Sequence, residues 1–85
     1  MFVVEKLKAL ADETRLKIIK ELLKKERNVT QLVEKVKKSQ PNVSLALNKL
    51  ENAKIISKKK NGKNIIYSLK NKENIKKILE LVKDE

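Results

Sequence analysis

The stretch from Ser39 to Glu51 carries the side chains best suited to specific recognition. Its apolar residues recur at helical spacing, which predicts one helix with a single buried stripe of Val43, Ala46, Leu47 and Leu50. The other side is short, amide-rich and free of carboxylates, and it presents Gln40, Asn42, Ser44, Leu45, Asn48 and Lys49. Amide side chains donate and accept hydrogen bonds at once, as an adenine edge in the DNA major groove requires. The helix is a candidate reader of DNA bases, although a solvated helix face in an ordinary bundle would look the same.

Positive charge is concentrated around this helix. The chain holds 22 basic and 11 acidic residues, for a formal net charge of +11. Eleven lysines and a single acid, Glu51, fall between Lys35 and Lys72. A lysine-rich proteome would explain the total charge but not the near-absence of acids in one span. The distribution predicts a surface that faces phosphates.

Further helices are predicted ahead of the recognition helix. One covers residues 1–11, and a second runs from Glu13 to Lys25 with Asp12 as its N-cap. A third is expected from Gln31 to about Lys37, with Thr30 as its N-cap. Ser39 then caps the recognition helix, and Pro41 fits its first turn. Two short helices joined by a tight turn outline a helix-turn-helix, in which Thr30 and Gln31 would contact the DNA backbone. The cap Ser39 is expected to belong to the same DNA-binding surface.

A β-hairpin is predicted to follow. Asn61-Gly62 is a strong signal for a type I′ turn, and alternating residues from Asn64 to Leu69 read as the return strand. The tip carries four lysines: Lys58, Lys59, Lys60 and Lys63. Lysines also protect strand edges against aggregation, but their closeness to the amide-rich helix favours a wing that contacts phosphates. A last helix is expected from about Lys72 to Lys83, capped by Asn71.

These segments predict a mainly α fold with a β-hairpin, namely a winged helix-turn-helix. Residues 1–85 would form one domain with four helices, a two-stranded wing and a C-terminal helix. In its motifs the chain resembles ArsR/SmtB-type transcriptional regulators. Residues 7–16 read LKALADETRL, similar to the family's LKALADPTRL, and residues 39–44 read SQPNVS, similar to its SQPAVS. Leu47, Leu50, Ala53 and Ile55 fit the HLxxLxxAGLV pattern, and residues 62–69 resemble the GRxVYYRL wing strand.

The resemblance implies a homodimer in which the terminal helices pack across a two-fold axis. The residues expected there are Phe2, Val3, Val4, Leu7, Ile78, Leu81 and Val82. Their side chains provide more apolar surface than a monomer of 85 residues easily covers. Alternatively, they could complete the subunit's own core. A two-fold dimer would place its recognition helices about 34 Å apart and read an inverted repeat. The amides, and Leu45 against a thymine methyl, predict an A·T-rich site.

Several classes of function are disfavoured. The chain has no cysteine and no histidine, so disulfides, thiolate or imidazole metal sites and histidine catalysis are excluded. The family's metal sensors carry such ligands in the third or last helix, and here residues 27–32 and the last helix lack them. No cofactor, no metal response and no enzymatic activity are therefore expected. No apolar run reaches membrane length and no secretory pattern opens the chain, which predicts a cytoplasmic protein without a membrane partner.

The sequence thus predicts a sequence-specific regulator of transcription that binds double-stranded DNA, as a homodimeric repressor at an A·T-rich inverted repeat. The charge is equally compatible with a nonspecific architectural nucleic-acid-binding protein. A third interpretation is an interaction module whose basic face meets an acidic protein partner.

Overall fold

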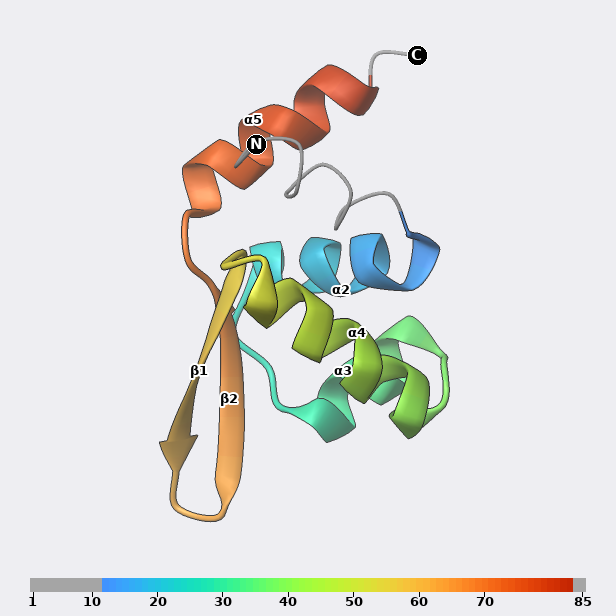
Figure 1. Ribbon diagram of the computed structural model, residues 1–85, viewed down its shortest axis with the longest axis vertical. Helices are drawn as coiled ribbons and strands as arrows, with labels where there is room; N and C mark the ends of the chain where they lie inside the picture. Colours follow the sequence, from blue (N-terminus) through green and yellow to red (C-terminus); the bar gives the residue numbers. More distant parts are fainter. Residues whose placement is uncertain (1–11, 84–85) are drawn as a thin grey trace.

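The structure is a computed structural model that describes residues 12–83, with side chains described for residues 12–80. In this range the elements are α2 (Glu13–Lys24), α3 (Val29–Val36), α4 (Gln40–Asn52), β1 (Ile56–Asn61), β2 (Asn64–Leu69) and α5 (Lys72–Lys83) (Figure 1). The helix predicted for residues 1–11 lies outside the described residues. The order of the other elements confirms the predicted winged helix-turn-helix.

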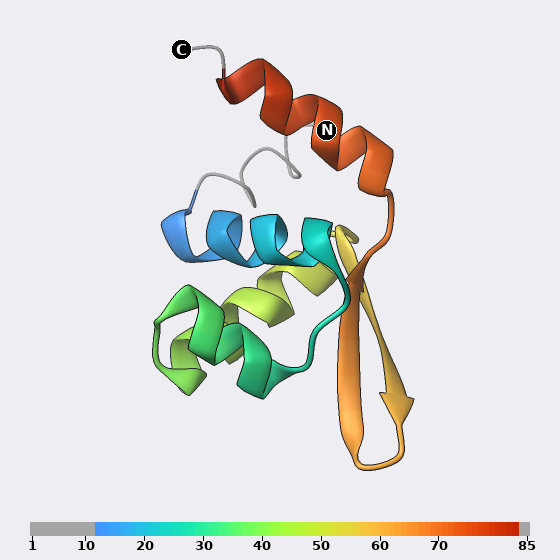
Figure 2. The same ribbon diagram turned by 180° about the vertical axis from the view of Figure 1, so that it is seen from behind.

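The core lies where α2, α3 and α4 meet. Each of these helices contributes a buried apolar stripe, and the four residues predicted for α4 are all at most 6% exposed: Val43, Ala46, Leu47 and Leu50. Ile18 and Ile19 of α2 and Leu32 of α3 are fully buried against them. Each such side chain contributes about 1.5–3 kcal/mol when it leaves water. Because α4 packs on both α2 and α3, its remaining side is left facing solvent (Figures 1 and 2).

The hairpin is anchored at its base and exposed at its tip. β1 and β2 pair antiparallel from Ile56 opposite Leu69 to Asn61 opposite Asn64. Near the base Ile56 and Tyr67 are buried, whereas the distal residues of both strands are exposed. The wing therefore projects beyond the helices as a free ribbon (Figure 1).

A buried arginine attaches the wing to the end of α2. Arg27 forms a two-way backbone bridge with Tyr67 of β2, with N–O distances of 3.2 and 2.8 Å. Its side chain is 7% exposed, its Nη2 lies 3.1 Å from Glu21 Oε1, and its Nε donates to the Glu21 carbonyl oxygen at 3.3 Å. The sequence predicted only a brief connection at residues 27–29, because nothing local indicates that Arg27 pairs with a strand forty residues later.

The predicted N-cap of α3 is wrong. The helix begins two residues before Gln31, at Val29, and its N-cap is Asn28 rather than Thr30. Asn28 Oδ1 accepts a hydrogen bond from the Gln31 amide at 2.8 Å, and Gln31 Oε1 accepts one from the Asn28 amide at 2.9 Å. This reciprocal capping box satisfies two amides, which a threonine at position 30 alone cannot do. The predicted end of α2 at Lys25 is also shifted, because Lys25 is its C-cap.

The predicted type I′ turn is wrong as well. Asn61 pairs with Asn64, so the two-residue loop is Gly62-Lys63 and not Asn61-Gly62. Within the hairpin only Gly62 has a positive φ, at 65°, whereas a type I′ turn needs positive φ at both central residues. Glycine takes the first loop position, as in type II′ turns, and the lysine that follows keeps a negative φ.

Candidate nucleic-acid interface

The start of α4 is built as the sequence predicts. Ser39 is extended, at φ −64° and ψ 157°, and its Oγ accepts a hydrogen bond from the Asn42 amide at 3.3 Å. Pro41 occupies the first turn, where an N–H has no helical acceptor. The cap fixes where the helix begins, and it thereby fixes which side chains of α4 face outward.

The outward side of α4 carries the predicted base-reading residues. Gln40, Asn42, Asn48 and Lys49 are exposed, as is Leu45 at 56%, and Ser44 is half-buried. Leu45 is therefore open to contact by another molecule. Of the two residues predicted on α3, Thr30 and Gln31 are both exposed, but Gln31 already uses its amide oxygen in the capping box.

The wing supplies exposed lysines on both of its faces. Lys58, Lys59, Lys60 and Lys63 are all exposed. Since side chains alternate along a strand, Lys58 and Lys60 share the face of Tyr67, and Lys59 lies on the other. Lys58 Nζ lies 3.5 Å from Glu51 Oε1 at the end of α4. The predicted lysines therefore do not form one flat patch.

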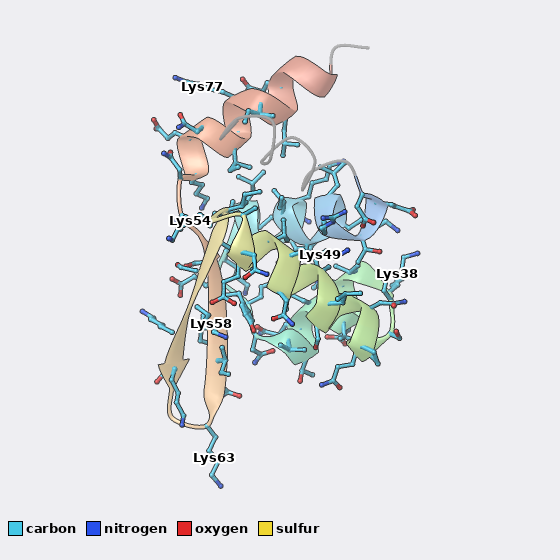
Figure 3. The ribbon with its side chains drawn as sticks, viewed as in Figure 1. Lys38, Lys49, Lys54, Lys58, Lys63 and Lys77 are labelled. Carbon is cyan, nitrogen blue, oxygen red and sulfur yellow. The ribbon has the colours of Figure 1, made fainter. Side chains whose placement is uncertain are left out.

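The exposed side chains of α4 and the lysines of the wing are together called the α4–wing face. It consists of Gln40, Asn42, Leu45, Asn48, Lys49, Lys58, Lys59, Lys60 and Lys63. Figure 3 shows Lys49 on α4, Lys58 between the wing and α4, and Lys63 at the tip of the wing. Lys77 on α5 lies at the opposite end of the molecule (Figure 3). Lys49 and Lys58 thus lie at the helix expected to read bases, and Lys63 extends away from it at the tip of the wing (Figure 3).

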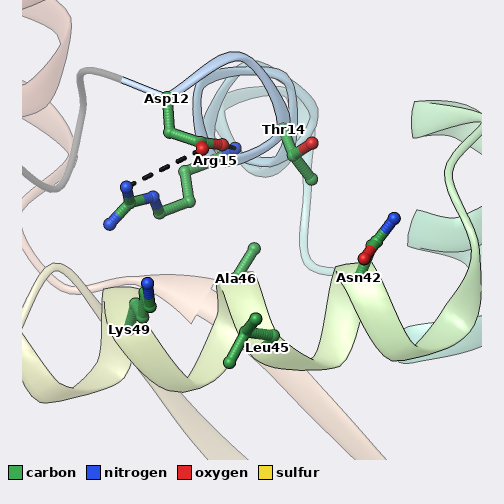
Figure 4. Close-up of a pocket in the computed structure, with 7 residues that line it drawn as sticks. All are labelled: Asp12, Thr14, Arg15, Asn42, Leu45, Ala46 and Lys49. Atoms are coloured by element: carbon green, nitrogen blue, oxygen red, sulfur yellow. Dashed lines mark hydrogen bonds and ion pairs between the residues drawn. The ribbon is translucent and has the colours of Figure 1, made fainter.

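A groove beside α4 was not predicted. Its volume is about 120 Å³, and it is lined by Asp12, Thr14, Arg15, Asn42, Leu45, Ala46 and Lys49 (Figure 4). Arg15 extends from α2 on the side where Lys49 projects from α4, and Thr14 and Asn42 lie at the other end (Figure 4). In the sequence, the residues of α2 that line this groove belong to the segment ADETR, which by itself indicates only the start of a helix.

The carboxylate of Asp12 is held in place at this groove. Its Oδ1 accepts a hydrogen bond from the Arg15 amide at 3.0 Å, and its Oδ2 lies 3.8 Å from Arg15 Nη2. The backbone hydrogen bond, helped by the positive charges of Arg15 and Lys49, lowers the pKa of Asp12 below its usual value. Asp12 is therefore an anion at neutral pH, and its confirmed role is to cap α2.

The predicted dimer residues are mostly outside the described part of the chain. Phe2, Val3, Val4 and Leu7 belong to residues 1–11, and the side chains of Leu81 and Val82 are not described either. Ile78 of α5 is half-buried and packs on the subunit's own core. The dimer surface stays a prediction.

Neither a metal-binding cluster nor a membrane-spanning helix occurs in the part of the chain that the structure describes. Between residues 12 and 83, no three Asp, Glu, His or Cys side chains are grouped so that they could hold a metal ion. None of the described helices combines the length and the apolar character needed to cross a membrane.

The chain is similar in sequence to known bacterial regulatory proteins. A sequence profile described as "Bacterial regulatory protein, arsR family" matches residues 12–58, from the cap of α2 into β1. The transcriptional regulator KmtR of Mycobacterium tuberculosis is 39% identical over 69 residues, which are 81% of this chain and 53% of that protein. A probable mercury resistance operon repressor of Streptomyces lividans is 40% identical over 62 residues, or 73% of this chain and 50% of that protein. The chain thus spans about half the length of these relatives.

A solved structure agrees with the fold. A homodimeric winged helix-turn-helix DNA-binding domain from Mycobacterium bovis superposes with a TM-score of 0.87, covering 99% of this chain and 80% of that one. At 23% identity this likeness establishes the fold alone. Since the profile covers more than half of the chain, the protein belongs to the arsR family of bacterial regulatory proteins.

Proposed function

We propose that this protein is a sequence-specific regulator that binds double-stranded DNA and represses transcription as a homodimer. The observation that carries the proposal is the outer side of α4, where amides and one exposed leucine stand without any carboxylate before Glu51. The membership in a family of regulatory proteins supports it. A cytoplasmic location is the natural one for such an activity.

Specificity is assigned to the α4 side chains. Gln40, Asn42, Ser44 and Asn48 would hydrogen-bond base edges, and Leu45 would contact a thymine methyl group. Amides pair well with adenine, and no arginine stands on α4 to read guanine. The expected operator is therefore rich in A·T pairs.

Affinity is assigned to the lysines. Each phosphate neutralised by Lys49 or by a wing lysine releases counterions and adds about 0.9 to the slope of log K against log salt. Thr30, together with the NH₂ group of Gln31, would fix the register on the backbone. Such contacts position the protein but carry no sequence information.

The dimer would pair the terminal helices of two copies. Its contact residues are proposed to be Phe2, Val3, Val4, Leu7, Ile78, Leu81 and Val82. The M. bovis domain with the same fold is described as homodimeric. Two recognition helices about one DNA turn apart would require an inverted repeat.

We also propose that the protein does not respond to soft metals. The name of the S. lividans relative refers to mercury resistance, and soft ions of that kind prefer thiolate ligands. This chain has no cysteine and no histidine, so its carboxylates alone could bind only hard cations weakly.

Selection of bound duplexes from a random library at about 150 mM salt, with the protein mass measured in the same buffer, tests the proposal. The expected result is an A·T-rich inverted repeat bound by a dimer. The charge of +11 also favours a second candidate, a nonspecific architectural protein. That candidate predicts no enriched sequence but a steep salt dependence. If no duplex is retained, the basic face belongs to an acidic protein partner.

A further inference from the structure

We propose that the groove between α2 and α4 receives a DNA backbone phosphate, with Arg15 as a contact in addition to those of the α4–wing face. The inference rests on the proposed DNA binding and extends the contact surface to the first turn of α2. It adds a residue that neither the sequence motifs nor the comparisons assign to DNA binding.

The position of the groove supports this assignment. It shares three residues, Asn42, Leu45 and Lys49, with the α4–wing face, so a helix that reads bases places the groove beside the duplex. An α-helix with its side chains is about as wide as the major groove, roughly 10–12 Å, so both DNA strands run close along its flanks. α4 packs against both α2 and α3, and the groove lies between α4 and the start of α2. The groove is the feature that the α2 flank offers to the second strand.

The charge of the groove also fits a phosphate. Arg15 and Lys49 contribute two positive charges and Asp12 one negative charge, which leaves a net charge of +1. Both oxygens of Asp12 are directed at Arg15, one through its amide at 3.0 Å and one towards its guanidinium at 3.8 Å. The second contact is longer than a hydrogen bond, so the guanidinium can turn to a phosphate at little cost. Arginine suits this role because its planar fork matches phosphate oxygens.

Asp12 limits the affinity of the groove. Its carboxylate caps α2 and cannot leave, so it faces any phosphate that enters. Asparagine caps a helix as well as aspartate does but carries no charge. Asp12→Asn therefore preserves the helix start and removes the repulsion, which makes it a clean probe of the site.

The test measures binding of one fixed duplex over a series of salt concentrations. We expect Arg15→Gln to weaken binding and to lower the log–log salt slope by about one, because one phosphate contact is lost. Arg15→Lys should keep most of the slope. Asp12→Asn should tighten binding by about fivefold, as expected for one charge near a phosphate in a solvated site. Lys77→Gln on α5 removes the same charge at the far end of the molecule and should change neither quantity.

The outcomes separate this inference from the proposed function. The phosphate site is overturned if Arg15→Gln and Lys77→Gln give the same salt slope and Asp12→Asn leaves the affinity unchanged. In that case the proposed DNA binding still stands, provided that variants of the wing lysines lower the slope. If the unsubstituted protein binds no DNA, the proposed function itself fails. Circular dichroism of each variant checks that the helices are retained. If Arg15→Gln fails to fold, Asp12→Asn alone decides, because its cap is intact.

Discussion

Glu51 Oε1, in the last turn of α4, lies 3.5 Å from Lys58 Nζ on the first half of β1. Glu51 is also the single acid between Lys35 and Lys72. The one negative charge in this basic span thus links the recognition helix to the wing. It pairs with Lys58 and lowers the net positive charge of this span.

Glu51→Gln should therefore change DNA binding more than stability. The pair is partly exposed, so its loss should lower the free energy of unfolding by less than about 1 kcal/mol. Without the carboxylate, binding to random duplex should rise a few-fold, because one repulsive charge leaves the surface. Fluorescence anisotropy with a random duplex measures this, and Glu80→Gln on α5 is the matched control. Weaker binding by Glu51→Gln would contradict the account.

The buried pair of Arg27 and Glu21 should matter for stability. Arg27→Ala should lower the free energy of unfolding by about 3–5 kcal/mol, because it leaves a carboxylate that is only 16% exposed without its buried partner. Lys24 contacts the same carboxylate at 3.2 Å but is 65% exposed. Lys24→Ala should cost less than about 1 kcal/mol. Urea unfolding of the two variants compares the stability contributed by a buried and by an exposed contact to the Glu21 carboxylate. Equal losses in the free energy of unfolding would refute the anchoring role of Arg27.

Asp12 should contribute an acid-dependent part of the stability. Its pKa in the folded protein lies below the usual value of 3.8, chiefly because of the hydrogen bond from the Arg15 amide. Its stabilising contribution is therefore fully present above pH 3.8 and is lost as the pH falls through the lower, folded pKa. Asp12→Asn should remove this part of the pH dependence and leave the helix capped near neutrality. Unfolding curves of the unsubstituted protein and of Asp12→Asn, measured between pH 6 and pH 2, would show the difference. Identical dependence of stability on pH in the two proteins would contradict a stabilising role of the Asp12 carboxylate.

Lys37 in the turn between α3 and α4 should be replaceable by glycine with a gain. It adopts a left-handed conformation at φ 62° and ψ 42°, which costs a non-glycine residue about 1 kcal/mol. Lys37→Gly should raise the free energy of unfolding by up to about 1 kcal/mol. Lys35→Gly, in the last turn of α3, should lower it, because glycine disfavours the helical conformation. Thermal unfolding distinguishes the two, and a loss for Lys37→Gly would contradict the strain at this turn.

Much of the fold follows from local signals. Ser39 and Pro41 mark the start of α4, helical spacing selects the four buried residues, and Asn71 caps α5 as predicted, its Oδ1 accepting from the Asn74 amide at 3.3 Å. The start of α3 differs from the prediction because Asn28, and not Thr30, forms reciprocal hydrogen bonds with Gln31.

Long-range relations could not be predicted in the same way. The bridge of Arg27 to Tyr67 and the groove at Arg15 both depend on how elements distant in the sequence pack. The observed hairpin loop lies one residue later than the predicted loop, because strand pairing extends through Asn61. The side chains predicted for α4 lie on its outer side, yet their contacts with DNA depend on a second molecule that the sequence does not contain.

The most direct test of the central claim is the affinity of the unsubstituted protein for its selected operator relative to random duplex at about 150 mM salt. The account predicts a ratio of at least about 10³, as is typical of specific regulators. It also predicts that Asn42→Ala lowers this ratio by about tenfold or more through loss of one base contact. Equal affinity for both duplexes would contradict sequence-specific recognition by α4 and would leave only a nonspecific, charge-driven interaction.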